Sequence, residues 1–198
     1  MIILIDNGHG CDTNGKYSPD GILREFAWAR QEARMLAEML RLKGYDARRI
    51  VTEETDIPLA ERVRRVNAVC RQAGAKNVVL VSIHVNAAGD GSGWMPASGW
   101  SVYVSSKNAS MKSKALAKAM LRRAKEARLL GNRCVPGAGY WEGNFAMVRD
   151  TDCPAVLVEN LFMDNKADVA LLQSDEGREK LAKVMADGID DWVCGGRM

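Results

Sequence analysis

Short apolar runs alternate with amphipathic helical patterns along this chain, and that alternation limits its possible folds more than any other feature. Ile2–Asp6, Val78–Ile83 and Ala155–Val158 have the length and character of strands buried on both faces. Apolar residues spaced by three and four predict helices that begin near Glu25, Pro58, Ser110, Lys166 and Asp175. This order predicts an α/β fold, with a mostly parallel central sheet flanked by helices on both faces.

The remaining segments fit one domain. Ala47–Val51 and Trp100–Val104 are candidate strands, and the first of them is expected at a sheet edge. Residues 86–99 and 130–145 are rich in glycine and lack periodicity, so both are expected to be loops. The chain has no internal repeat, linker or low-complexity tract, and we expect residues 1–198 to form a single domain.

Composition excludes several classes of protein. Twenty-eight basic and 25 acidic residues leave a net charge of +3, too mild to indicate nucleic-acid binding. No apolar run approaches the roughly 20 residues that a membrane span needs. The five cysteines are odd in number and form no CxxC pair, which argues against a disulfide framework and favours free thiols. Met1 leads straight into a strand, so we expect synthesis in the cytoplasm without a signal peptide.

Four residues with metal-binding or acid–base chemistry follow predicted strands or begin a predicted helix. His9, His84 and Glu159 each come after a buried strand, and Glu25 begins the first helix. Because parallel strands end at one edge of a sheet, these side chains are expected in one crevice. Two imidazoles and one carboxylate form a common catalytic zinc set, and a second carboxylate can then act as a general base.

Each residue also has an ordinary structural interpretation. A histidine after a strand is more often a structural hydrogen-bonding residue than a ligand. An acidic residue such as Glu25 favours the first turn of a helix because of the helix dipole. Glu159 is the more telling residue, because apolar neighbours on both sides make its burial costly without a partner or a role.

Three motifs connect these residues to a known family. The segments Asp6–Gly10 (DNGHG), Ser82–Ala87 (SIHVNA) and Pro154–Glu159 (PAVLVE), together with Glu25, stand in the family's order over nearly the whole chain. The sequence thereby resembles the zinc-dependent N-acetylmuramoyl-L-alanine amidases of the autolysin and phage-lysin type.

The resemblance implies a fold, a cofactor and a reaction. It implies Zn²⁺ bound by His9, Glu25 and His84, with Glu159 as the catalytic acid and base. It implies hydrolysis of the amide between N-acetylmuramic acid and L-alanine in peptidoglycan, at the bacterial cell wall. We expect a monomer that reaches the wall through lysis or a partner. The alternatives are a zinc peptidase acting within stem peptides and a non-catalytic wall-binding module.

Some features depart from the family or admit two interpretations. The family usually has a glycine before the phenylalanine that follows its catalytic glutamate, and Leu161 stands there in this chain, which should alter the pocket floor. The loop at residues 86–99 is too short for a regulatory helix, so we expect an uncovered cleft. Tyr140, Trp141 and Phe145 either pack their loop against the protein or line the substrate groove.

A thiol close to the first histidine offers a further alternative. Cys11 lies two residues from His9 and suggests a cysteine–histidine enzyme. Such an enzyme would leave Glu25 and Glu159 without a role. We therefore expect Cys11 to be a bystander near the metal.

Overall fold

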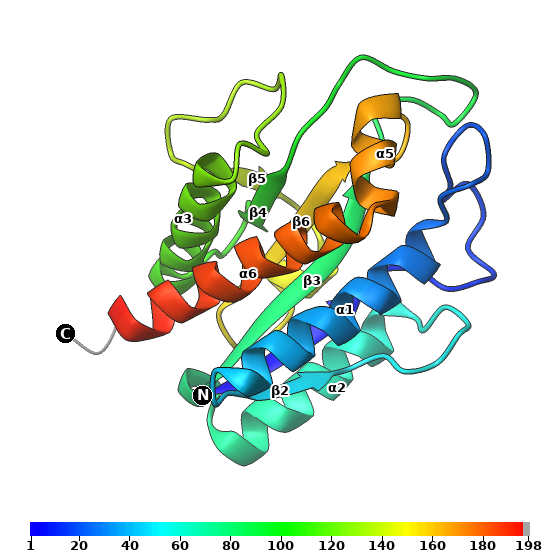
Figure 1. The fold of residues 1–198 in the computed structure, drawn as a ribbon. Helices are drawn as coiled ribbons and strands as arrows, with labels where there is room; N and C mark the ends of the chain where they lie inside the picture. Colours follow the sequence, from blue (N-terminus) through cyan, green and yellow to red (C-terminus); the bar gives the residue numbers. More distant parts are fainter. Residues whose placement is uncertain (196–198) are drawn as a thin grey trace.

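Six strands form one sheet at the centre of the protein, which a computed structural model describes over residues 1–195 (Figure 1). The strands are β1 (Ile2–Asn7), β2 (Asp46–Arg49), β3 (Val78–Asn86), β4 (Ser101–Ser105), β5 (Trp141–Gly143) and β6 (Ala155–Phe162). Their order across the sheet is β2-β1-β3-β6-β4-β5. The strands β2, β1, β3 and β6 are parallel, whereas β4 runs antiparallel to β6 and β5 follows the direction of β4.

Helices cover both faces of this sheet, as predicted. They are α1 (Glu25–Leu42), α2 (Leu59–Ala73), the short 3₁₀ helix Ala75–Asn77, α3 (Met111–Glu126), α4 (Ala146–Arg149), α5 (Lys166–Gln173) and α6 (Asp175–Gly195). One hydrophobic core joins the sheet to α1, α3, α5 and α6, and a second core joins its other face to α2 and α4 (Figure 1). Within residues 1–195, no helix combines the length and the apolar character that crossing a membrane requires.

Helix α1 shows how the sequence positions the site. Trp28, Ala29, Leu36 and other apolar residues at helical spacing are buried against the sheet, which fixes the face that the helix presents. The indole N–H of Trp28 donates to the carbonyl of Leu172 at 2.8 Å and joins α1 to α5. The helix begins at Glu25, beside the carboxyl ends of the parallel strands, so its first side chain reaches that edge.

Some elements differ from the sequence-based expectation. The strands β3 and β6 continue past their apolar runs, so His84 and Glu159 lie within strands and are paired with each other across the sheet. The segment expected to be a loop over residues 130–145 contains β5, which pairs with β4 at the sheet edge. This three-residue strand, Trp-Glu-Gly, is held by backbone pairing and has no apolar run that would reveal it.

Glu32 of α1 is a buried carboxyl group outside the site. Its side chain is 1% exposed, and neither oxygen has a hydrogen-bond partner in the described part of the chain. Burial raises the pKa of Glu32 to about 8 from an ordinary 4.5, against the opposing charge of Arg178. The folded protein therefore binds this proton more tightly than the unfolded chain, and stability is lost as the pH rises from about 4.5 to about 8.

We predict that Glu32→Gln removes this loss. The variant should exceed the wild type in free energy of unfolding by about 2–4 kcal/mol at pH 9, and by much less at pH 5. Urea unfolding at both pH values measures the difference. Glu38→Gln, at an exposed position of the same helix, is the control and should show no such pH dependence. An equal effect of Glu32→Gln at the two pH values would contradict the prediction.

Candidate metal centre and active site

His9 lies in the loop after β1 and is held there by two arginines. Its φ of 61° is left-handed, a conformation that non-glycine residues adopt at some cost. The carbonyl oxygen of His9 accepts hydrogen bonds from Arg30 Nη1 at 3.0 Å and from Arg62 Nη2 at 3.3 Å. Arg62 is 2% exposed and also forms an ion pair with Asp6 at 2.7 Å. These contacts direct the imidazole of His9 over the sheet edge.

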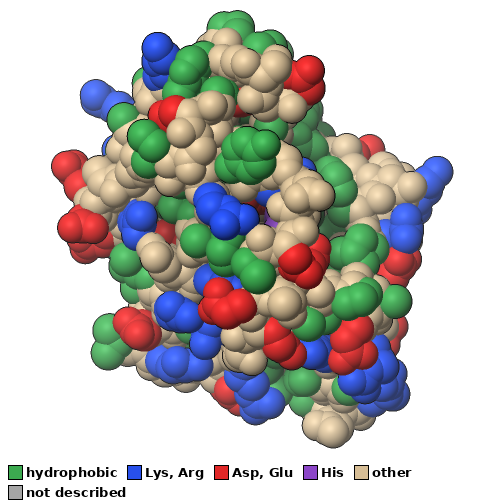
Figure 2. Space-filling model, turned by 90° about the vertical axis from the view of Figure 1, so that its right-hand side faces the viewer, with side chains coloured by type: hydrophobic (Ala, Val, Ile, Leu, Met, Phe, Trp, Pro, Cys, Tyr) green, Lys and Arg blue, Asp and Glu red, His purple; other side chains and the backbone are tan. Residues whose placement is uncertain are grey.

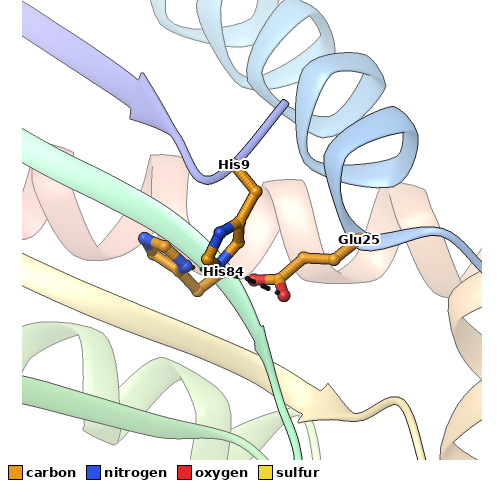
Figure 3. Close-up of side chains that lie close together, drawn as sticks. All are labelled: His9, Glu25 and His84. Carbon is orange, nitrogen blue, oxygen red and sulfur yellow. Dashed lines mark hydrogen bonds and ion pairs between the residues drawn. The ribbon is translucent and has the colours of Figure 1, made fainter. Parts of the chain in front are cut away.

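Glu25 and His84 complete a group of three side chains (Figure 3). Glu25 Oε1 accepts from the backbone N–H of Val85 at 3.0 Å and lies 3.0 Å from His84 Nδ1. Its other oxygen, Oε2, lies 3.5 Å from His9 Nε2 and is buried without a hydrogen-bond partner in the described residues. The two imidazole rings meet edge to face, with their centroids 5.1 Å apart. Three separate segments thus bring their donor atoms to one point.

The arrangement of these donors fits a metal ion. One atom from each of His9, Glu25 and His84 lies within 4.8 Å of the others. Ligands of a tetrahedral zinc ion are about 3.3 Å apart. Each imidazole lies at a similar distance from one of the two carboxylate oxygens of Glu25, 3.0 Å for His84 and 3.5 Å for His9. The unpartnered, buried oxygen of Glu25 is a further sign, because such an atom is costly unless something pairs with it. This His–Glu–His group can bind a metal.

The protonation states also favour cation binding. Burial, partly opposed by Glu25, lowers the pKa of His9 to about 4, so its imidazole is neutral and able to ligate at neutral pH. Burial alone would raise the pKa of Glu25, but the hydrogen bond and charge of His84 hold it below its ordinary value. The same contact raises the pKa of His84 against its burial. A bound cation would take the place of the proton between His84 and Glu25.

Glu159 is a second carboxyl group beside this cluster, on a half-buried side chain whose Oε2 is buried. It lies on β6 directly across from His84, and its Oε2 has no hydrogen-bond partner within residues 1–195. Burial raises the pKa of Glu159 to about 7, while His84, Lys16 and Arg133 oppose the rise. A carboxyl group with a pKa near neutrality can both accept and return a proton.

A β-bulge after Glu159 explains the unusual position of Leu161. The pairs His84–Glu159 and Asn86–Phe162 enclose one more residue on β6 than on β3. Leu161 takes up this extra length with a φ of 65°, a conformation that glycine adopts at little cost. This backbone requirement accounts for the glycine that the resemblance implies at this point.

The loop that follows β1 requires a glycine at position 8. At Gly8, an added Cβ would lie 2.3 Å from Cε1 of the His84 imidazole, so any larger residue must displace that ring. We predict that Gly8→Ala weakens metal binding at least about tenfold, the usual scale for disturbing a ligand's support. Competition with a chelator measures the affinity. Gly93→Ala, where a Cβ meets open space, is the control, and equal affinities of the two variants would contradict the prediction.

The arginines that hold the His9 loop were not predicted from the sequence. Arg62 lies on the buried face of α2 with Val66 and Cys70, and Arg30 lies on the buried side of α1. The sequence did contain a signal for them: each arginine interrupts an apolar helical face, and a charged residue in that position is rarely buried without partners. Their partners are backbone carbonyls and, for Arg62, the carboxylates of Asp6 and Asp56, which only the folded chain brings together.

The predicted cleft is open to solvent. Side chains of His9 and His84 remain 20% and 17% exposed, and residues 87–100 form no helix above them. Figure 2 shows histidine in a hollow of the face where the parallel strands end, with basic side chains beside it. A His–Glu–His cluster with a carboxyl group beside it in such a hollow is typical of metal-dependent hydrolases.

Comparison with known proteins identifies the family. Residues 3–191 match the N-acetylmuramoyl-L-alanine amidase family, and the chain belongs to it. The endolysin of Bacillus phage SPP1 is 29% identical over 95% of this chain and 64% of its own length. The amidase AmiC of Neisseria meningitidis serogroup B is 28% identical over 97% of this chain and 52% of its own.

A solved structure agrees with the fold. The catalytic domain of CwlV, an N-acetylmuramoyl-L-alanine amidase from Bacillus (Paenibacillus) polymyxa var. colistinus, superposes with a TM-score of 0.79 at 25% identity. The alignment covers 98% of both chains. By contrast, this chain spans only about half to two thirds of the length of the two curated relatives above.

Proposed function

We propose that residues 1–198 form one amidase catalytic domain that hydrolyses the bond between N-acetylmuramic acid and L-alanine in peptidoglycan. The observation that carries this proposal is the cluster of His9, Glu25 and His84 beside the half-buried Glu159, in a chain of the amidase family. The site of action is then the bacterial cell wall. A separate wall-binding role is less well supported, because a binding module needs no acid and base.

We propose zinc as the metal, held by His9, Glu25 and His84. Two imidazole nitrogens and one carboxylate oxygen with an open position are a common donor set for catalytic zinc. When bound, zinc polarises a carbonyl group and lowers the pKa of water toward about 7. The neutral state of His9 and the ionised state of Glu25 at neutral pH are the states that this role needs.

Glu159 is proposed as the acid and base of the reaction. As a base, its carboxylate accepts a proton from the water that attacks the lactyl carbonyl. As an acid, it returns that proton to the nitrogen of L-alanine when the amide bond breaks. Burial of Glu159 places its pKa near 7, where one group can perform both steps.

Digestion of purified peptidoglycan tests the proposal. Zinc-loaded protein is incubated with the polymer, and the new termini are identified by mass spectrometry, with the chelated protein as the control. New L-alanine amino termini, formed only with metal, are the expected result. New termini confined to the interior of the stem peptides would make the protein a peptidase, and no new termini would favour a non-catalytic module.

A further inference from the structure

Arg133 lies in the loop between α3 and β5, and its side chain contacts residues of β4 and β5. Its Nη1 donates to Ser101 Oγ at 3.1 Å, and its Nη2 donates to the hydroxyl of Tyr103 at 3.3 Å. The guanidinium also lies over the ring of Trp141, 4.9 Å from its centroid. An arginine stacked on an aromatic ring and bonded at two points has little freedom left to lose when it binds a ligand.

This guanidinium lies close to Glu159. Ser101, which Arg133 contacts, is paired directly with Glu159 across β4 and β6. Residues directly opposite in an antiparallel pair project to the same face, so Arg133 lies over the face that carries the Glu159 side chain. The ring of Phe162, at the end of β6, lies 5.6 Å from the same guanidinium. Arg133 is thus part of the wall beside the proposed acid and base.

The positive charge of Arg133 has no carboxylate partner in the described part of the chain. Arg62, Arg123 and Arg149 all form ion pairs, whereas the two hydrogen bonds of Arg133 go to neutral hydroxyl groups. A guanidinium has five N–H donors, so most of them remain available. A half-buried, stacked cation with unused donors favours an anion, above all a carboxylate that can bind two donors at once.

The proposed reaction indicates which part of the bound substrate lies next to the guanidinium of Arg133. Glu159 protonates the departing nitrogen of L-alanine, so the peptide side of the substrate lies on the side of Glu159. The residue after L-alanine in a stem peptide is D-glutamate, linked onward through its γ-carboxyl group. Its α-carboxylate is therefore the first anionic group on the peptide side.

We propose that Arg133 is a specificity-determining residue that binds the α-carboxylate of this D-glutamate. The inference rests on the proposed function and adds a substrate class to it: stem peptides with a free α-carboxylate are favoured over those in which this group is an amide. Trp141 contributes by holding the guanidinium in place. This gives a supporting role in binding to Trp141, one of the three aromatic residues of the segment at residues 140–145.

Two matched substrates test the proposal. One is N-acetylmuramoyl-L-alanyl-γ-D-glutamyl-L-lysine, and the other differs only in an α-amide on the glutamate. For the zinc-loaded wild type, kcat/KM should favour the carboxylate substrate by roughly tenfold or more, the scale of a hydrogen bond to a charged group. In Arg133→Gln the two values of kcat/KM should become nearly equal, because kcat/KM for the carboxylate substrate falls and that for the amide substrate does not. Arg71→Gln, at an exposed position of α2, should keep the wild-type preference.

The outcomes separate this inference from the proposed function. An equal loss on both substrates in Arg133→Gln, or an unchanged preference, would overturn the role of Arg133 while leaving the amidase activity established. If the wild type cleaves neither substrate, the proposed function fails. In that case, calorimetry with L-alanyl-γ-D-glutamyl-L-lysine and its α-amide still decides the inference. Tighter binding of the carboxylate, lost in Arg133→Gln, supports it, and equal binding overturns it.

Discussion

Glu159→Gln should retain close to one zinc ion per chain and lose turnover by about a thousandfold. The amide keeps the shape of the carboxyl group but cannot accept the proton, and general acid–base catalysis is worth about 10²–10⁴ in rate. Metal should remain because Glu159 lies outside the group formed by His9, Glu25 and His84. Elemental analysis and release of L-alanine peptides from the same preparation measure the two quantities.

The fold should tolerate this substitution. Glu159 is half-buried, and its Oε2 is buried without a hydrogen-bond partner in the described residues, so a neutral amide removes a charge that is costly to bury. A Glu159→Gln protein that loses its zinc would make Glu159 a ligand and require a new role for Glu25. One that keeps both zinc and most of its activity would mean that another residue is the base.

His84→Ala should lose both metal and activity. The imidazole of His84 is one of three proposed ligands, and two remaining ligands hold zinc weakly. We expect zinc content far below one per chain after dialysis, and turnover lower by about a thousandfold or more, because several kcal/mol of electrostatic stabilisation disappear with the metal. His9→Ala and Glu25→Ala should behave in the same way.

A nearby carboxylate provides the control for the ligand variants. Glu54→Gln changes an exposed residue outside the cluster and should keep both zinc and activity. Circular dichroism should show that all of these variants are folded. Full zinc content in folded His84→Ala would contradict the assignment of His84 as a ligand.

Much of the fold follows from local patterns in the sequence. The apolar runs in β1, β3 and β6 and the helical stripe of α1 predict those elements because each buries a defined face. The convergence of His9, Glu25 and His84 was also predictable, since parallel strands end at one edge. Their roles as ligands, and that of Glu159 as acid and base, came from the resemblance and stay a proposal.

Other parts of the site depend on contacts between segments far apart in the chain. The left-handed backbone of His9 is stable because Arg30 and Arg62 reach its carbonyl from two different helices. The short β5 strand forms only because β4 offers it an edge. Trp141 and Arg133 meet through that pairing, so no local pattern predicted the cation beside Glu159.

The most direct test of the proposed chemistry is hydrolysis in water enriched in oxygen-18. The zinc-loaded protein cleaves N-acetylmuramoyl-L-alanyl-γ-D-glutamyl-L-lysine, and mass spectrometry locates the heavy oxygen in the products. Attack of water on the lactyl carbonyl predicts the label in the carboxylate of muramic acid and an unlabelled peptide that begins with L-alanine. Label within the peptide, with the bond between muramic acid and L-alanine intact, would contradict the amidase assignment.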